Sequence, residues 1–289
     1  MIPDRWFGQP GRLYAPTILV FVVLAFGLSW AIWIPLAVTG TQSWLKDVAS
    51  FSPAVAAVLV SLPDPDRRAA WHRRLLLWRI PGRLYGIALL APPIVCLAAV
   101  GVTEALGVEG LQYNDPAQLD LVVPAFLAVL VLGGPLGEEP GWRGVLQPAL
   151  GGWFSPSRAG LLVGVVWAAW HLPLFAIPGT PQAQVPIGLY VAFTIGLGVI
   201  YGWLAGRSGD SVPVAILLHA SSNTAAGVLP VFPMDAGGSL VPFGLVSVVT
   251  TSIALVLLVR DSPGGGGRHR DGASHTARAA SDASEEDTR

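Results

Sequence analysis

The sequence predicts an all-α, polytopic integral membrane protein, with about eight transmembrane helices around a central polar site. Of the 289 residues, 53% are hydrophobic and only 12% are charged, whereas about 25% are charged in soluble proteins. The chain also has 34 Gly and 25 Pro, and both residues are more frequent in transmembrane helices than in soluble ones. This composition argues against a soluble enzyme, a nucleic-acid-binding protein and a secreted disulfide-rich module. The single cysteine, Cys96, cannot form an intrachain disulfide.

The third observation is a series of apolar runs of membrane-spanning length. A helix needs roughly 20 apolar residues to cross a hydrocarbon core about 30 Å thick. The first run follows Arg5 and Arg12, as in a signal peptide, but it is too long and lacks a small-residue cleavage site, so we expect a retained anchor. The second run is short and contains Pro53. The eight predicted spans are 16–38, 48–62, 84–106, 121–137, 157–177, 186–205, 212–230 and 241–259.

The arginines predict the orientation, because Lys and Arg accumulate in cytoplasmic loops. With eight crossings and a cytoplasmic N-terminus, all arginines lie on the cytoplasmic side and only Lys46 lies outside. We therefore predict a multi-pass protein of the inner (cytoplasmic) membrane with both termini in the cytoplasm. The arginines are Arg5, Arg12, six between positions 67 and 83, Arg143, Arg158, Arg207, Arg260 and four after residue 261, while the outer loops carry Glu109, Asp115, Asp120 and Asp235.

Two segments differ from the apolar runs. In residues 64–83, arginine pairs alternate with Trp and Leu, which is typical of an amphipathic helix on an anionic leaflet; a regulatory or substrate-gathering role is the alternative. Residues 261–289 are rich in Gly, Ser, Ala and charge without apolar periodicity, so we predict a disordered cytoplasmic tail. The transmembrane domain is accordingly expected over residues 1–260.

The first polar cluster in the spans is the sequence GEEPGWRG at residues 137–144. On a helix, Glu139 and Arg143 are four residues apart with the acid first, which favours an ion pair, whereas Glu138 points roughly 100° away. Pro140 disfavours a helical Glu139 and predicts a break followed by a new helix. The alternative is an interfacial charge cluster at the cytoplasmic edge of the span.

Two further clusters contain histidine. His171 precedes Pro173, which cannot donate to the Ala169 carbonyl and so leaves a polar acceptor beside the imidazole. His219 and Asn223 are four residues apart and share one helix face with Ser222. Each could serve only a structural role, as a hydrogen-bonded histidine or as polar contacts between helices.

Together, these residues predict a hydrolytic site. Ionisable residues are costly in lipid and are functional candidates by default. Two acids, two histidines and an asparagine supply a base for water and donors for a developing oxyanion. Counting about 1.5 Å per residue from the cytoplasmic ends leaves His219 and His171 at different depths, near 12 Å and 20 Å, which helix tilt has to compensate.

These motifs resemble those of the CPBP family of intramembrane proteases, also called the CAAX-protease and bacteriocin-processing, Abi or type II CAAX prenyl endopeptidase-like family. The resemblance rests on Glu-Glu-x-x-x-Arg, an aromatic-x-x-x-His pair and His-x-x-x-Asn, in this order, and covers about residues 121–225. Trp167 stands where Phe is common in the family. The matching positions are Glu138, Glu139 and Arg143, then Trp167 and His171, then His219 and Asn223.

The resemblance implies hydrolysis of a peptide bond of a membrane-embedded or lipid-linked peptide. It assigns water activation to Glu138, with Glu139 beside it and held by Arg143. His171 is expected to assist the water, and His219 with Asn223 to bind the oxyanion or a metal. Metal-dependent and glutamate-dependent mechanisms are both open. We favour the metal-dependent type, in which Glu138, His171 and His219 would hold Zn²⁺, because two His and one Glu form a known catalytic zinc set.

Two alternatives remain open at this level. The same carboxylates and imidazoles could form a proton relay in a proton-coupled transporter, or the protein could be a non-catalytic membrane scaffold or immunity factor. The expected partners are membrane lipids and a peptide or protein substrate in the membrane, with no nucleic acid. The sequence does not identify the substrate or the oligomeric state.

Overall fold

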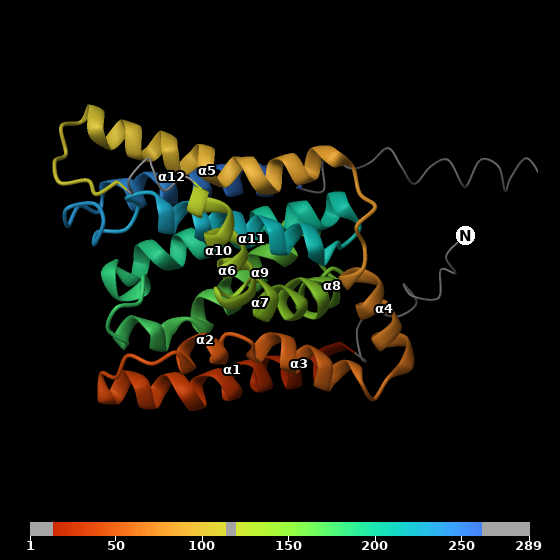
Figure 1. Ribbon diagram of the computed structural model, residues 1–289. Coiled ribbons are helices and arrows are strands. Elements are labelled where there is room, and N and C mark those ends of the chain that lie inside the picture. Colours follow the sequence, from red (N-terminus) through yellow and green to blue (C-terminus); the bar gives the residue numbers. More distant parts are fainter. Residues whose placement is uncertain (1–13, 114–119, 262–289) are drawn as a thin grey trace, which may run out of the picture.

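The computed structural model describes residues 14–113 and 120–261, and its regular elements are helices (Figure 1). In these residues the only β-type pairing is an isolated bridge between Leu111 and Ala236. The predicted all-α class is therefore confirmed. The segment with Arg5 and Arg12 lies outside the described residues, as does the predicted tail apart from Asp261.

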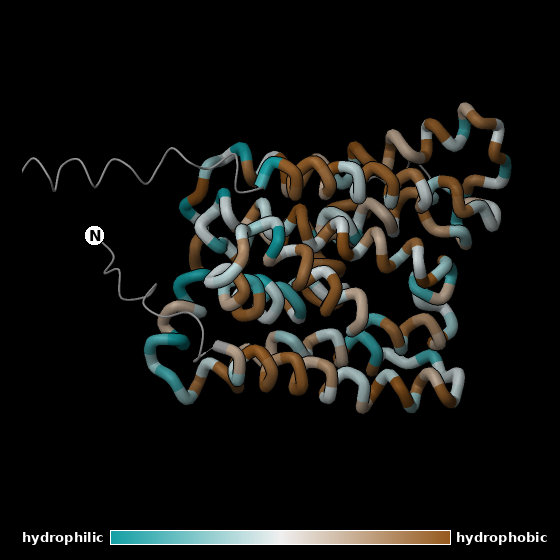
Figure 2. Tube along the Cα trace, turned by 180° about the vertical axis from the view of Figure 1, so that it is seen from behind, coloured by the Kyte–Doolittle hydropathy of each residue, from teal (hydrophilic) through white to brown (hydrophobic). Residues whose placement is uncertain are grey.

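Five helical segments are long and apolar enough to cross a membrane, and they make this a multi-pass membrane protein. They are α1 (Tyr14–Thr39), α5 (Gly82–Ala105), α9 (Pro156–Trp170) with the 3₁₀ turn that follows it to Ala176, α10 (Ile187–Ser208) and α12 (Val241–Arg260). Large apolar side chains such as Leu19, Leu90 and Leu255 are exposed, which suits a lipid solvent. Hydrophobic residues predominate along the long helices (Figure 2).

The predicted count of eight spans is not confirmed. A sixth span exists only if the bent pair Val122–Leu132 and Pro135–Leu150, which meet at 46°, is counted as one. The predicted spans 48–62 and 212–230 correspond to helices too short for the same test. These are α2 (Leu45–Ala49) with α3 (Ser52–Ser61), and α11 (Val212–Val228).

The bend separates α6 (Val122–Leu132) from α7 (Pro135–Gly141) at Gly133 and Gly134. Gly134 has φ +103°, a conformation that other residues rarely adopt, and Pro135 takes the first-turn position where its missing N–H costs nothing. The predicted break at Pro140 is wrong, because Pro140 lies inside α7.

The backbone departs from α-helical geometry two residues after Pro140. A π-helix (Trp142–Leu146) links α7 to the short α8 (Gln147–Leu150). Single π turns of this kind occur frequently at functional sites. The two predicted site acids thus lie between a glycine break on one side and a π turn on the other.

The arginine-rich segment forms helix α4 (Pro65–Leu75), whose first turn is capped by the Asp64 carboxylate. Trp71 is buried and donates its indole N–H to the Pro140 carbonyl at 2.9 Å. Arg74 donates to the Gly144 carbonyl at 3.2 Å. Trp71 therefore anchors α4 to the protein, and the predicted contact of this segment with an anionic leaflet stays a prediction.

Helices α9 and α10 approach each other through glycine. A side-chain carbon at Gly164 would lie 2.9 Å from the Ile195 Cα and 3.3 Å from the Gly198 Cα. Small residues allow such close backbone approach, which is how many membrane helices associate. The contact fixes α9, which carries Trp167, against α10, which carries Tyr201.

We expect Gly164→Ala to destabilise the protein by about 1–3 kcal/mol, because the added methyl meets backbone atoms that cannot move independently. The measurement is the thermal unfolding temperature of the purified protein in detergent. The control is Gly188→Ala in α10, where an added carbon meets nothing within 4 Å and alanine favours the helix. An unchanged unfolding temperature for Gly164→Ala would contradict this packing.

Candidate active site

The carboxylate of Glu139 joins three elements in the protein interior. Its Oε1 lies 2.8 Å from His219 Nδ1 on α11, and its Oε2 lies 3.1 Å from Arg143 Nε in the π-helix. All three side chains are at most 5% exposed. The Arg143 guanidinium also lies 4.3 Å from the ring centroid of Tyr201 on α10. The predicted ion pair between Glu139 and Arg143 is present, and the contact with His219 adds a third partner that the spacing did not predict.

Glu138 has hydrogen-bond partners of its own. Its Oε2 accepts hydrogen bonds from Trp167 Nε1 at 2.6 Å and from Trp142 Nε1 at 3.4 Å. Its residue is only 4% exposed. The two indole donors hold one carboxylate oxygen and leave Oε1 facing Gly134. Glu138 is thus a buried carboxylate with one oxygen fixed and the other directed away from the indoles.

His171 lies at the end of α9, which is fixed at both ends. Asp261 accepts a hydrogen bond from the Ser157 N–H at 3.0 Å, a favourable place for an acid at a helix N-terminus. At the other end, Trp30 of α1 donates to the Trp170 carbonyl at 2.9 Å. These contacts set the position from which Trp167 and His171 project.

The imidazole of His171 has a defined tautomer. Its Nδ1 lies 2.8 Å from the Trp167 carbonyl, and because a carbonyl only accepts, Nδ1 carries the proton. Its Nε2 is then a proton acceptor when the ring is neutral. The expected acceptor beside the ring was the Ala169 carbonyl, and this prediction is wrong, because the helix ends at Trp170 and brings the Trp167 carbonyl to the ring instead.

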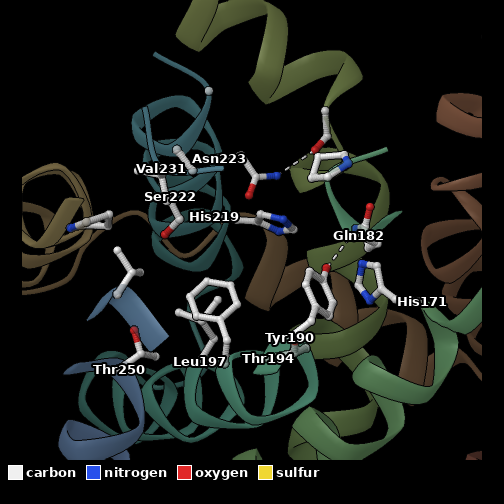
Figure 3. Close-up of a pocket in the computed structure, with 18 of the residues that line it drawn as sticks. His171, Gln182, Tyr190, Thr194, Leu197, His219, Ser222, Asn223, Val231 and Thr250 are labelled. Atoms are coloured by element: carbon white, nitrogen blue, oxygen red, sulfur yellow. Dashed lines mark hydrogen bonds between the residues drawn. The ribbon is translucent and has the colours of Figure 1, made fainter. Parts of the chain in front are cut away.

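His171 and His219, which were predicted to lie at different depths, both contact the side chain of Trp167. The Trp167 ring centroid lies 5.5 Å from that of His171 and 5.5 Å from that of His219. Figure 3 shows both imidazoles beside the same cavity, with Tyr190 between them and the α10 wall. The two rings therefore share one space although they come from separate helices.

Asn223 extends the site toward the helix break. Its Nδ2 donates to the Gly133 carbonyl at 3.1 Å (Figure 3), which satisfies a backbone group at the end of α6. Ser222, on the adjacent position, donates instead to the Leu218 carbonyl of its own helix. Asn223 retains one amide hydrogen and its carbonyl oxygen for other partners.

A cavity of about 700 Å³ connects these groups. Its lining includes Glu138, His171, His219 and Asn223, whereas Glu139 and Arg143 lie behind the wall. Gly134 also lines it. A side-chain carbon there would lie 2.5 Å from Glu138 Oε1 and 3.8 Å from His219 Cε1, so the space in front of Gly134 adjoins both groups. A water molecule or a substrate carbonyl at this point would contact both.

The predicted zinc ligands do not fit a metal site. Within residues 14–113 and 120–261, no three His, Cys, Asp or Glu side chains are grouped so that they could hold one ion. The hydrogen bonds of His219 Nδ1, His171 Nδ1 and Glu138 Oε2 leave Nε2 of each imidazole and Oε1 of the carboxylate unoccupied, so the misfit lies in the separation of the groups and not in these hydrogen bonds. In this structure, Glu138, His171 and His219 line a cavity, and each makes a hydrogen bond to a neighbouring protein group.

Sequence reasoning missed three aromatic contributors. Trp167 was noted only for its place in a motif, and Trp142 and Tyr201 were not identified. Trp142 stands four residues after Glu138, the spacing at which helical side chains meet, so this partner was detectable. Tyr201, under the Arg143 guanidinium, gave no local signal because it lies on α10.

The region that contains the candidate site residues matches a known protein family. Residues 120–225 match the family model described as Rce1-like, type II CAAX prenyl endopeptidase. The match includes every one of the candidate residues. This region of the chain is similar to that family. Each of the three motifs in this region contributes at least one side chain to the lining of the cavity.

Two curated proteins are similar to the chain. CAAX prenyl protease 2 of Methanococcus maripaludis is 26% identical over 145 residues, covering 47% of this chain and 53% of the relative. Lysostaphin resistance protein A of Staphylococcus haemolyticus is 24% identical over 252 residues, covering 86% of this chain and 66% of the relative. The chain thus spans about half to two thirds of the length of these relatives. Their names differ in function, so the activity of this chain has to be argued from its site.

We expect Gly134→Ala to reduce any activity of this site by about 100-fold, the scale of loss that a misplacement of about 1 Å can cause. The new methyl would strain a backbone at positive φ and displace Glu138 Oε1. The measurement is turnover per folded protein, with folding checked by size-exclusion chromatography. Gly86→Ala, where an added carbon meets nothing within 4 Å, is the control. Equal turnover in both variants would show that the space at Gly134 is not used.

Proposed function

We propose that this protein is an intramembrane endopeptidase that hydrolyses a peptide bond of a membrane-embedded or lipid-linked peptide. The observation that carries the proposal is Glu138, a buried carboxylate with one oxygen held by two indoles and the other facing the cavity beside His219. A general base must be within reach of the proton that it abstracts, and a water in front of Gly134 satisfies this condition.

The first step is attack by water. Glu138 Oε1 removes a proton from the water, and the resulting hydroxide oxygen bonds to the carbonyl carbon of the substrate. His171 Nε2, an acceptor in the tautomer fixed by the Trp167 carbonyl, can accept a hydrogen bond from the same water. The tryptophan donors keep Glu138 in place while its charge changes, which is the preorganisation that favours such a step.

The second step is collapse of the tetrahedral intermediate. His219, whose Nδ1 faces the Glu139 carboxylate, presents its Nε2–H toward the cavity and can donate to the oxyanion together with the free amide hydrogen of Asn223. With Nδ1–H donating to the Glu139 carboxylate, the imidazolium form of His219 carries a second hydrogen, on Nε2, for this donation. The proton taken up by Glu138 then passes to the leaving amine as the C–N bond breaks, which restores the carboxylate.

The roles of Glu139 and Arg143 are indirect. Neither lines the cavity, and the ion pair between them orients the carboxylate that holds His219. We therefore regard both as positioning residues. Their substitution should affect the geometry of His219 and, through it, stabilisation of the oxyanion.

We expect Glu138→Gln to lower peptide hydrolysis by at least about 100-fold, the contribution of a positioned general base, while the fold is retained. A glutamine carbonyl can still accept from Trp167. The assay follows cleavage of membrane-embedded peptides by purified protein in liposomes, with mass spectrometry of the products. Glu109→Gln, at an exposed glutamate, is the matched control and should cleave normally.

Two outcomes would contradict the proposal. Wild-type cleavage by Glu138→Gln would remove the base from the mechanism. Full complementation of a deletion strain by this variant would instead favour a non-catalytic scaffold.

We expect activity without a bound metal, because no three of the described acid, cysteine and imidazole side chains are grouped closely enough to hold one ion. Purified protein should keep its activity after treatment with a strong zinc chelator. Its zinc content should equal that of a His171→Ala/His219→Ala double variant. Loss of one equivalent of zinc in the double variant, with loss of wild-type activity on chelation, would overturn this expectation.

A further inference from the structure

The proposed steps make no use of Tyr190, a polar side chain in the wall of the cavity. Tyr190 lies in the first turn of α10, is 8% exposed, and lines the cavity together with Glu138, His171 and His219. A buried tyrosine carries one polar group, and this hydroxyl usually finds a hydrogen-bond partner. The partners of the Tyr190 hydroxyl therefore indicate what it can do.

The ring of Tyr190 is fixed by aromatic neighbours. Its centroid lies 5.6 Å from that of His171 and 5.4 Å from that of Phe175, both in edge-to-face contacts. Phe193 of the same helix lies 6.3 Å away. A tyrosine has only two side-chain torsions, so this packing sets the position of the hydroxyl. Figure 3 shows the hydroxyl directed away from α10, toward the side of the cavity on which His171 and His219 lie.

The oxygen of this hydroxyl accepts hydrogen bonds from the protein. Gln182, in the 3₁₀ turn Gln182–Gln184 that precedes α10, donates from Nε2 to the Tyr190 oxygen at 2.9 Å (Figure 3), and an amide nitrogen is only a donor. The Thr194 hydroxyl, one turn further along α10, also bonds to this side chain, and it can supply a second hydrogen because a hydroxyl donates as well as accepts. With its oxygen engaged in this way, Tyr190 keeps its own hydrogen for a group in the cavity.

The Tyr190 hydroxyl lies close to the groups that act on the substrate. The His171 ring, which contacts Tyr190, also contacts the ring of Trp167, and Trp167 donates to Glu138. The Glu138 carboxylate is near enough to interact electrostatically with the Tyr190 hydroxyl. Tyr190 and the proposed general base therefore adjoin the same part of the cavity.

We propose that Tyr190 is a further catalytic residue, whose hydroxyl donates to the oxygen of the scissile carbonyl as this oxygen becomes an oxyanion. It acts together with His219 Nε2–H, so that donors from α10 and α11 face the oxygen from two walls of the cavity. Tyrosine is among the side chains that serve as preorganised oxyanion donors. The hydrogen stays on Tyr190 throughout, and Glu138 alone carries the proton from the water to the leaving amine.

Gln182 is a positioning residue in this proposal. It holds the Tyr190 oxygen, and an O–H group that accepts a hydrogen bond becomes a better donor. The inference rests on the proposed function, because it assigns a role within the same hydrolysis.

We expect Tyr190→Phe to lower kcat for peptide cleavage by about 100- to 1,000-fold, the loss on removal of one oxyanion donor, and to leave KM nearly unchanged, because the interaction is made in the transition state. Phenylalanine keeps the ring contacts with His171 and Phe175, so packing alone predicts no loss. The measurement is turnover per folded protein in liposomes, with the thermal unfolding temperature as the check on folding. Tyr113→Phe, at an exposed tyrosine outside the cavity lining, is the control and should cleave normally.

Gln182→Glu tests the positioning role. An ionised carboxylate only accepts, so the Tyr190 O–H turns toward it and away from the substrate, and kcat should fall in this variant too. Gln184→Glu is the matched control, because it adds the same charge in the same turn and its carboxylate can still accept from the Met234 N–H. In the Tyr190→Phe background, Gln182→Glu should have little further effect, since changes within one hydrogen-bond network are not additive.

The outcomes separate this inference from the proposed function. Wild-type kcat in Tyr190→Phe would overturn the role of the hydroxyl, and so would a rise in KM alone, which indicates a contact made equally in the ground state. Equal losses in Gln182→Glu and Gln184→Glu would overturn the positioning role of Gln182. Absence of cleavage by the wild-type protein would instead overturn the proposed function, and this inference with it.

Discussion

The buried charge group of Glu139, Arg143 and His219 is the constraint on which the site depends. An unpaired charge in an apolar interior costs several kcal/mol, and Glu139 is fully buried. Its two oxygens face one guanidinium and one imidazole at 3.1 Å and 2.8 Å, so α7, the π-helix and α11 are stable only in the arrangement that brings these groups together. The position of His219 at the cavity follows from the need to compensate this carboxylate.

The irregular backbone around the acids depends on specific donors. Non-helical backbone at membrane depth is tolerated only where it is buried in protein or lines a cavity. Here Asn223 satisfies the Gly133 carbonyl at the break, and Trp71 and Arg74 satisfy the Pro140 and Gly144 carbonyls around the π turn. The break gives Glu138 a space that a straight helix would fill, and α4 holds the acid-bearing helix from the opposite side.

Much of the molecule was predictable because membranes impose simple rules. Long apolar runs gave α1, α5, α9, α10 and α12, since only helices satisfy their own backbone in lipid. The candidate residues were found because ionisable side chains are rare in such runs. Hydropathy did not reveal that 48–62 forms only short helices or that 121–137 is interrupted at Gly133, because a chain packed against protein can break or form only a short helix, as α3 does. The predicted zinc ligands are a different case: residue types suggested a set, but in the described residues no three acid, cysteine or imidazole side chains are grouped so that they could hold one ion.

By itself, the sequence determined the helical class, the family resemblance, the identity of the polar residues and the one-sided distribution of arginine, because each of these is a property of composition or of local spacing. Only the tertiary structure determined which polar side chains contact one another. It paired Glu139 with His219 across 80 positions, placed two indoles on Glu138 and brought the Trp167 carbonyl to His171. Such partners are selected by the free energy of burying charge among neighbouring helices, and that free energy depends on the packed geometry, which local spacing does not encode.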